Sequence, residues 1–62
     1  MSKTIQPGAR INLKIHGGEV FAVEILSVEH DGAKFRNVRR GVESEASLAW
    51  LRARATDDPS TP

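Results

Sequence analysis

Apolar and polar residues alternate along most of the sequence, and this pattern constrains the fold more than any other feature. In residues 10–16 (RINLKIH) every second residue is aliphatic, which is typical of a strand with one buried face. A helix does not match this alternation, because its apolar face repeats about every 3.6 residues. The sequence therefore predicts a β domain.

The second predicted strand, residues 19–30, changes the face of its apolar residues part of the way along. Phe21, Val23 and Ile25 share one parity, whereas Leu26 and Val28 have the other. A change of parity within one strand indicates a β-bulge or a sharp bend. We expect this strand to bend so that a very small sheet can close.

Glycines and one short connection delimit the next strands. Gly17-Gly18 predicts a two-residue hairpin loop, and Asp31-Gly32 predicts the next tight turn. The third strand, 33–36, has its alanine and phenylalanine inward and its lysine and arginine outward. After a connection over 37–41, alternation over 42–46 predicts a fourth strand.

Residues 44–55 (SEASLAWLRARA) are compatible with two structures. One is a 3₁₀ turn over 47–51 followed by a short fifth strand, 52–55, with its alanines inward. The other is a C-terminal helix, capped by Ser44 or Ser47, that packs its leucines on the sheet. We expect the first, which completes a five-stranded antiparallel barrel and makes the chain all-β.

The chain is short enough for one domain only. We expect a flexible lead-in over 1–8, a barrel over 9–55 and a disordered tail over 56–62, because the tail carries two acids, two prolines and no large apolar side chain. Cysteine is absent, which excludes disulfides and thiolate zinc sites. Tight packing or self-association must then stabilise the 62 residues.

Other features argue against a metal, a membrane or export. His16 and His30 are too few and too far apart for a metal site, and we expect no cofactor. His16, at the outward edge of the first strand, is interpreted as a polar residue beside the turn. No apolar run approaches the roughly 18 residues of a membrane span, and the N-terminus lacks the apolar core of a secretory signal. We therefore expect a cytoplasmic protein.

Several short segments occur in the order in which small bacterial barrels carry them: Gly8-Ala9-Arg10-Ile11, Lys14, Gly17, Ala22-Val23-Glu24-Ile25-Leu26, Asp31-Gly32-Ala33-Lys34-Phe35 and Glu45-Ala46-Ser47-Leu48. This order resembles bacterial SH3-like barrels of the Tudor or KOW type, including the C-terminal domain of the ProQ family of RNA chaperones. Residues 45–49 also resemble the SH3-like dimerisation domain of the KorB family of partition repressors. Residues 42–46 are similar to the tetrameric type II dihydrofolate reductases, but the Val-Gln-Ile-Tyr motif of their pore has no counterpart here. The resemblance implies an SH3-like barrel that binds RNA, DNA or a protein.

No catalytic constellation is present in the sequence. Glu43 and Glu45 share the outer face of a strand, and we interpret them as a solvated, like-charged edge. The nucleophile-elbow glycines and a phosphate-cradling glycine loop are both missing. We therefore expect a protein that is not an enzyme; a site formed only between subunits is the remaining enzymatic alternative.

Charge is unevenly distributed along the chain. Residues 17–32 carry four acids and no Lys or Arg, whereas residues 33–54 are rich in arginine, which suits phosphates and stacks on bases. We predict a non-catalytic nucleic-acid-binding site, with Trp50 stacking on a base. The predicted cations are Lys34, Arg36, Arg39, Arg40, Arg52 and Arg54.

Three alternatives to this site remain open. The arginines can simply solvate the barrel or pair with the acidic hairpin, and Trp50 can cover the open end of the barrel with the leucines on either side of it. A protein-interaction or oligomerisation module is the third alternative. It would use the oppositely charged halves, or an exposed strand edge.

Overall fold

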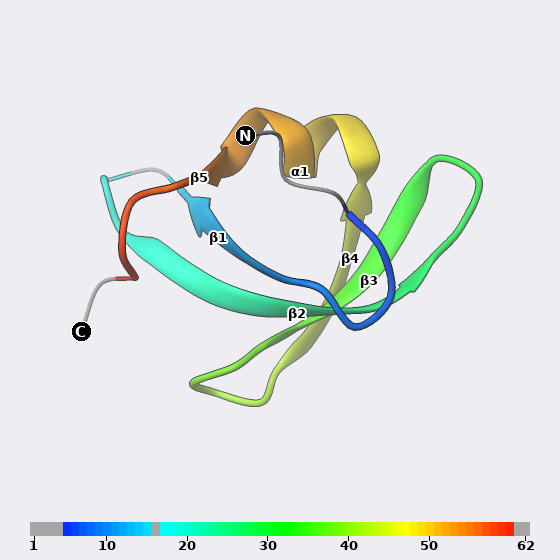
Figure 1. The fold of residues 1–62 in the computed structure, drawn as a ribbon, viewed down its shortest axis with the longest axis horizontal. Coiled ribbons are helices and arrows are strands. Elements are labelled where there is room, and N and C mark those ends of the chain that lie inside the picture. Colours follow the sequence, from blue (N-terminus) through cyan, green and yellow to red (C-terminus); the bar gives the residue numbers. More distant parts are fainter. Residues whose placement is uncertain (1–4, 16, 61–62) are drawn as a thin grey trace.

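The computed structural model describes residues 5–15 and 17–60. They form an antiparallel sheet of five strands with one short helix (Figure 1). The elements are β1 (Arg10–Lys14), β2 (Val20–Val28), β3 (Gly32–Asn37), β4 (Glu43–Ser47), α1 (Leu48–Arg54) and β5 (Ala55–Thr56). The β-rich fold predicted from the alternation is thus confirmed.

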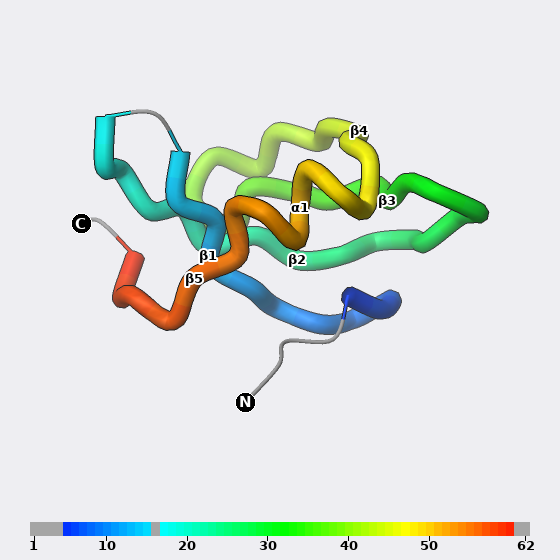
Figure 2. Tube along the Cα trace, turned by 90° about the horizontal axis from the view of Figure 1, so that it is seen from above, coloured from blue at the N-terminus to red at the C-terminus, as the bar shows by residue number. Residues whose placement is uncertain are grey.

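Successive strands lie side by side, and the last strand returns to the first. The order in the sheet is β4-β3-β2-β1-β5, and β5 pairs antiparallel with β1. The sheet is strongly twisted, with α1 across one of its faces (Figures 1 and 2). Within the described residues, β4 and β5 are the two edges of the sheet, and α1 links them.

The first hairpin confirms the predicted glycine turn and corrects its length. The backbone N–H of Ile15 donates to the C=O of Glu19 at 2.9 Å, so the loop has three residues rather than two. Gly17 and Gly18 both have positive φ, of 91° and 83°, a region that glycine enters without steric cost. The first strand ends at Lys14. The interpretation of His16 as a polar residue beside the turn concerns a position outside the described residues.

The bulge predicted in the second strand is confirmed. Ile25 pairs with Phe35, whereas Ser27 pairs with Lys34, which leaves Leu26 as the extra residue. The extra residue reverses the faces of the strand beyond it. Val28 therefore pairs with Ala33 and packs against the same core as Ile25.

The second turn also differs by one residue from its prediction. The N–H of Glu29 donates to the C=O of Gly32 at 2.8 Å. The loop residues are therefore His30 and Asp31, and Gly32 already begins β3. A Cβ on Gly32 would lie 3.2 Å from the carbonyl oxygen of Ala46, so glycine at this position allows β3 and β4 to approach closely.

The predicted 3₁₀ turn and fifth strand over 52–55 are wrong, and the helical alternative is correct. Residues 48–54 form an α-helix, and the hydroxyl of Ser47 accepts a hydrogen bond from the N–H of Trp50 at 3.0 Å. This contact is the N-cap that serine provides at a helix start. The strand after the helix is only Ala55–Thr56. This strand ends one residue beyond residue 55, where the barrel was predicted to end.

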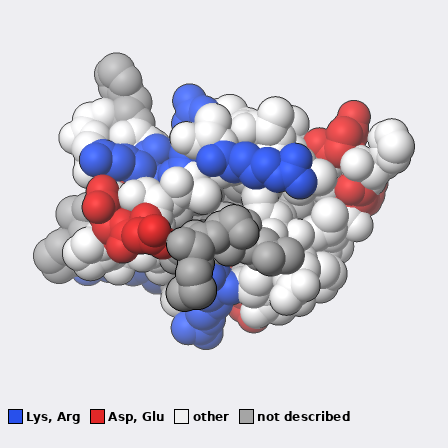
Figure 3. Space-filling view, turned by 45° about the horizontal axis from the view of Figure 1, so that its top comes forward, with Lys and Arg blue, Asp and Glu red and all other residues white. Residues whose placement is uncertain are grey.

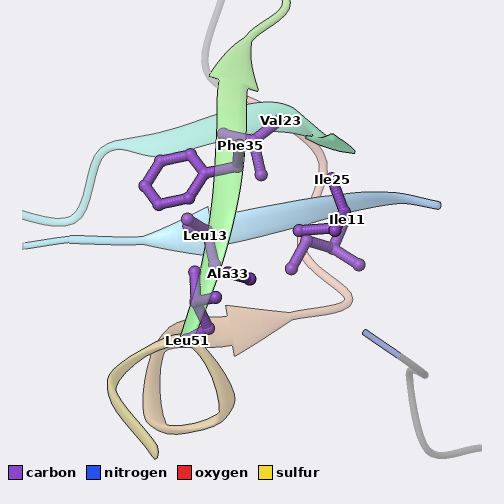
Figure 4. Close-up of a cluster of buried hydrophobic side chains, with 7 residues drawn as sticks. All are labelled: Ile11, Leu13, Val23, Ile25, Ala33, Phe35 and Leu51. Carbon is purple, nitrogen blue, oxygen red and sulfur yellow. The ribbon is translucent and has the colours of Figure 1, made fainter. Parts of the chain in front are cut away.

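The core lies between the sheet and α1. Side chains from three strands and the helix form one buried cluster (Figure 4): Ile11, Leu13, Val23, Ile25, Ala33, Phe35 and Leu51. Leu51 has no exposed surface and is the one buried residue of α1. The prediction that Ala33 and Phe35 point inward is confirmed.

The tail is held to the first strand by polar contacts. Asn12 donates a side-chain hydrogen bond to the C=O of Asp58 at 2.9 Å, and Nζ of Lys14 lies 3.3 Å from Oδ2 of the same residue. Both contacts are exposed, so each contributes little to stability.

Candidate nucleic-acid interface

Two of the predicted cations lie in rows of alternating charge on the outer face of the sheet. Lys34 and Arg36 are exposed on β3. The strand register places Arg36 between Glu24 and Glu43, and Arg10 on the far side of Glu24. Nη2 of Arg36 lies 3.0 Å from Oε1 of Glu24.

Lys34 belongs to the next row, with Ser27 on one side and Glu45 on the other. Opposite charges placed directly across a pair of strands attract each other. Arg36 is thus neutralised by an ion pair with Glu24, whereas Lys34 lies opposite Glu45 without forming an ion pair with it. The Arg36–Glu24 pair corresponds to the alternative in which the arginines pair with the acidic hairpin of residues 17–32.

Arg39 and Arg40 lie in the turn between β3 and β4, and Asn37 fixes that turn. The side-chain oxygen of Asn37 accepts hydrogen bonds from the backbone N–H of Arg39 at 2.9 Å and of Arg40 at 3.0 Å. Its backbone C=O accepts from the N–H of Gly41 at 2.7 Å, where φ is +73°. Asparagine bonded to the backbone two and three residues on is a common device for ordering a turn. The turn directs Arg40 to the same hollow as Trp50.

Trp50 and Arg54 contact each other on α1. They are four residues apart, a spacing that brings two side chains together on a helix. The guanidinium carbon of Arg54 lies 4.4 Å from the centroid of the Trp50 ring, within the range of a cation–π interaction. The predicted strand over 52–55 would place Arg52 and Arg54 on the same face. The helix instead turns the exposed Arg52 away from Trp50 and Arg54.

The indole ring of Trp50 is half-buried against the core. It stacks with Phe35, with ring centroids 6.5 Å apart and planes 11° apart. This arrangement corresponds to the alternative in which Trp50 covers the open end of the core. Its ring contacts Phe35 and Arg54, so it is not a free stacking platform.

Trp50 lines a hollow of about 220 Å³ at the end of the core, which we call the Trp50 hollow. Its polar lining comes from Asn37, Arg40 and Ser44, and the rest is apolar. Val42, at its rim, is 56% exposed. The apolar walls are Leu13, Ile15, Phe21, Val23, Phe35, Val42 and Trp50.

Sequence reasoning did not identify these walls as part of a site. Phe21 and Phe35 had been assigned to the core by parity, and Val42 to the fourth strand. The sequence offers one signal for this site. Val42 is an aliphatic residue that directly follows the Arg39-Arg40-Gly41 turn.

Cations and acids separate on the face of the molecule that carries α1. Figure 3 shows Lys and Arg side chains in a band across this face, with Asp and Glu side chains gathered mainly at its two sides. Of the predicted cluster, Arg40 and Trp50 line one hollow, and Arg54 contacts the Trp50 ring. Arg39 lines a neighbouring hollow with Phe21 and Val38.

In the part of the chain that the structure describes, no group of three or more His, Asp or Glu side chains is placed to hold a metal ion. No helix among the same residues is long and apolar enough to cross a membrane. Comparison of the chain with family models, with curated proteins and with solved structures finds no match.

Proposed function

We propose that this chain is a non-catalytic module that binds single-stranded nucleic acid at the Trp50 hollow. The observation that carries the proposal is that Arg40 and Trp50 line one aromatic hollow while a second arginine packs on the Trp50 ring. Arg40 comes from the β3–β4 turn, and Arg54 reaches the Trp50 ring from α1. Proteins that bind single strands combine such cations, which contact phosphates, with apolar and aromatic surfaces, which contact bases.

The ligand is a single strand because the bases must leave their stack to reach apolar walls. The hollow is smaller than the roughly 300 Å³ at which pockets for drug-sized ligands begin. It therefore accepts one base edge or ring rather than a whole nucleotide. The phosphates on either side of that base would contact Arg40 and Arg54, with Arg52 and Arg39 as outlying cations.

An SH3-like barrel is the fold class that we propose for this module. Its support is the four-stranded meander of β1 to β4, the return of β5 to β1 and the bulge in β2. The short helix between β4 and β5 covers the gap between the two edge strands.

The test is the binding of a fluorescently labelled single-stranded oligonucleotide at a series of salt concentrations. We expect affinity to fall as salt rises, because each phosphate contact releases counterions. Arg40→Gln and Arg54→Gln should each weaken binding about fivefold, corresponding to about 1 kcal/mol for an exposed charge contact. Each should also make the plot of log affinity against log salt concentration less steep, by about the slope that one phosphate contact contributes.

Arg10→Gln is the matched control, because it removes the same charge from an exposed position beside Glu24 on the sheet. It should leave affinity nearly unchanged. Equal losses in Arg10→Gln and Arg40→Gln would mean that only net charge matters. That result, or an affinity that does not depend on salt, would contradict the proposed site.

A further inference from the structure

The outer edge of β4 is open among the described residues. β4 is the terminal strand of the sheet and pairs only with β3 (Figure 2). Hydrogen bonds from the N–H of Asn37 to the C=O of Val42 and from the N–H of Leu48 to the C=O of Asp31 mark hydrogen-bonded pairs at the two ends of this ladder. In an antiparallel ladder such pairs alternate with non-bonded ones. The backbone N–H and C=O groups of Glu43 and Glu45 therefore point away from β3.

The side chains on this edge are the last members of the two charge rows. One row runs Arg10, Glu24, Arg36 and Glu43 across four strands. The next contains Lys34 and Glu45. Both rows end in a glutamate, and neither of these glutamates forms an ion pair with another described residue.

We infer that the β4 edge binds an extended peptide with Lys or Arg at two alternate positions. An added antiparallel strand would pair its backbone with that of Glu43 and Glu45. The peptide residues opposite these glutamates are two apart, so their side chains share the outer face. A Lys or Arg at each of those two positions would lie directly opposite Glu43 or Glu45. Cross-strand pairs of opposite charge are favourable.

A second copy of the chain is a poor occupant of this edge. In the fully overlapped antiparallel register of two β4 strands, Glu45 of one copy would lie directly opposite Glu45 of the other, and like charges in that position are destabilising. Charged side chains on an edge strand also act against self-pairing in general. The occupant is therefore a basic peptide from a different chain. This inference concerns another surface than the Trp50 hollow and does not depend on the proposed function.

The experiment compares two acetylated peptides of identical composition by titration into ¹⁵N-labelled full-length protein. In Ser-Thr-Arg-Val-Arg-Thr-Ser the arginines share one face of a strand, whereas in Ser-Thr-Arg-Arg-Val-Thr-Ser they face opposite ways. We expect the first to bind more tightly and to shift the amide signals of Glu43 and Glu45. N-methylation of both arginines of the first peptide should abolish binding, because it removes the donors to the β4 carbonyls.

Glu45→Gln and Glu19→Gln are matched variants with the same change in charge. Both glutamates are exposed, but Glu19 lies beside the first hairpin. We expect Glu45→Gln to weaken the first peptide by about threefold, as for an exposed ion pair, and Glu19→Gln to leave it unchanged. Arg40→Gln should also leave peptide binding unchanged, which separates this site from the nucleic-acid site.

Three results would overturn the inference. Equal affinity for the two peptides would show attraction without strand pairing. Shifts centred away from Glu43 and Glu45 would place the peptide elsewhere. The third result is a dimer of the protein alone in light scattering, with the amides of Glu43 and Glu45 protected from hydrogen exchange. It would assign the edge to a second copy.

Discussion

Replacement of Leu51 by alanine should remove a large part of the stability of this domain. Leu51 is the one side chain of α1 that is fully buried, and it lies in the cluster formed by β1, β2 and β3. Leu→Ala at fully buried sites costs about 3 to 5 kcal/mol, from lost transfer free energy and the cavity that remains. A domain of this size is stable by about 3 to 9 kcal/mol in total.

The expected result is a melting temperature lower by at least about 12 °C, since 1 kcal/mol corresponds to roughly 4–8 °C in so small a domain. Thermal unfolding followed by far-ultraviolet circular dichroism gives the midpoint. Fluorescence of Trp50, the single tryptophan, reports separately whether α1 leaves the sheet before the strands unfold. If the variant does not fold at all, the loss of free energy equals or exceeds the total stability of the domain.

Two controls on the same helix distinguish packing from helix propensity. Arg52 and Ala53 are both exposed, so Arg52→Ala and Ala53→Gln should change stability by less than about 0.5 kcal/mol. Ala53→Gln is also informative for the alternative strand, which would have buried this alanine. A loss below about 1 kcal/mol for Leu51→Ala, or a large loss for Ala53→Gln, would refute the packing of α1 described above.

Two further changes test the ends of the elements around the hollow, again by thermal unfolding. Ser47→Ala removes the hydroxyl that accepts a hydrogen bond from the N–H of Trp50 and should lower the free energy of unfolding by about 1 kcal/mol. Ser44→Ala is the control, because Ser44 is exposed on a strand and caps no helix, so it should cost much less. Equal losses for the two variants would contradict the cap. Gly41→Ala places a side chain at φ +73° and should lower the free energy of unfolding by about 1 kcal/mol. Gly41→Asn should cost less, because asparagine tolerates the left-handed region better than alanine does. The reverse order would contradict a left-handed conformation at residue 41.

Much of the sheet could be predicted from the sequence because strand faces depend on residues two positions apart. Ala33 and Phe35 lie inward as their parity predicts, and the parity change after Ile25 marks the bulge at Leu26. A bulge leaves such a trace because one extra residue moves every later side chain to the other face. The loop lengths did not follow in the same way, because glycine identifies a turn without fixing which residues pair beside it.

The candidate site was predictable only in part. Arg40, Arg54 and Trp50 were named from composition, and the structure places Arg40 and Trp50 on one hollow and Arg54 against the Trp50 ring. Lys34 and Arg36 were predicted to join them because they belong to the same arginine-rich segment, residues 33–54. Strand register instead places these two opposite Glu45, Glu24 and Glu43. Register depends on pairing between distant segments, which no local pattern specifies.

By itself, the sequence determined an antiparallel β domain, the faces of its strands and the position of its bulge, because these follow from local alternation. Tertiary structure decided the conformation of residues 48–54. There, alternating arginine and alanine matches a strand while the same residues also favour a helix. An isolated helix of seven residues is unstable in water. The helix forms because the Ser47 hydroxyl caps its first turn and because Leu51, buried against the sheet, adds packing energy that the local pattern lacks.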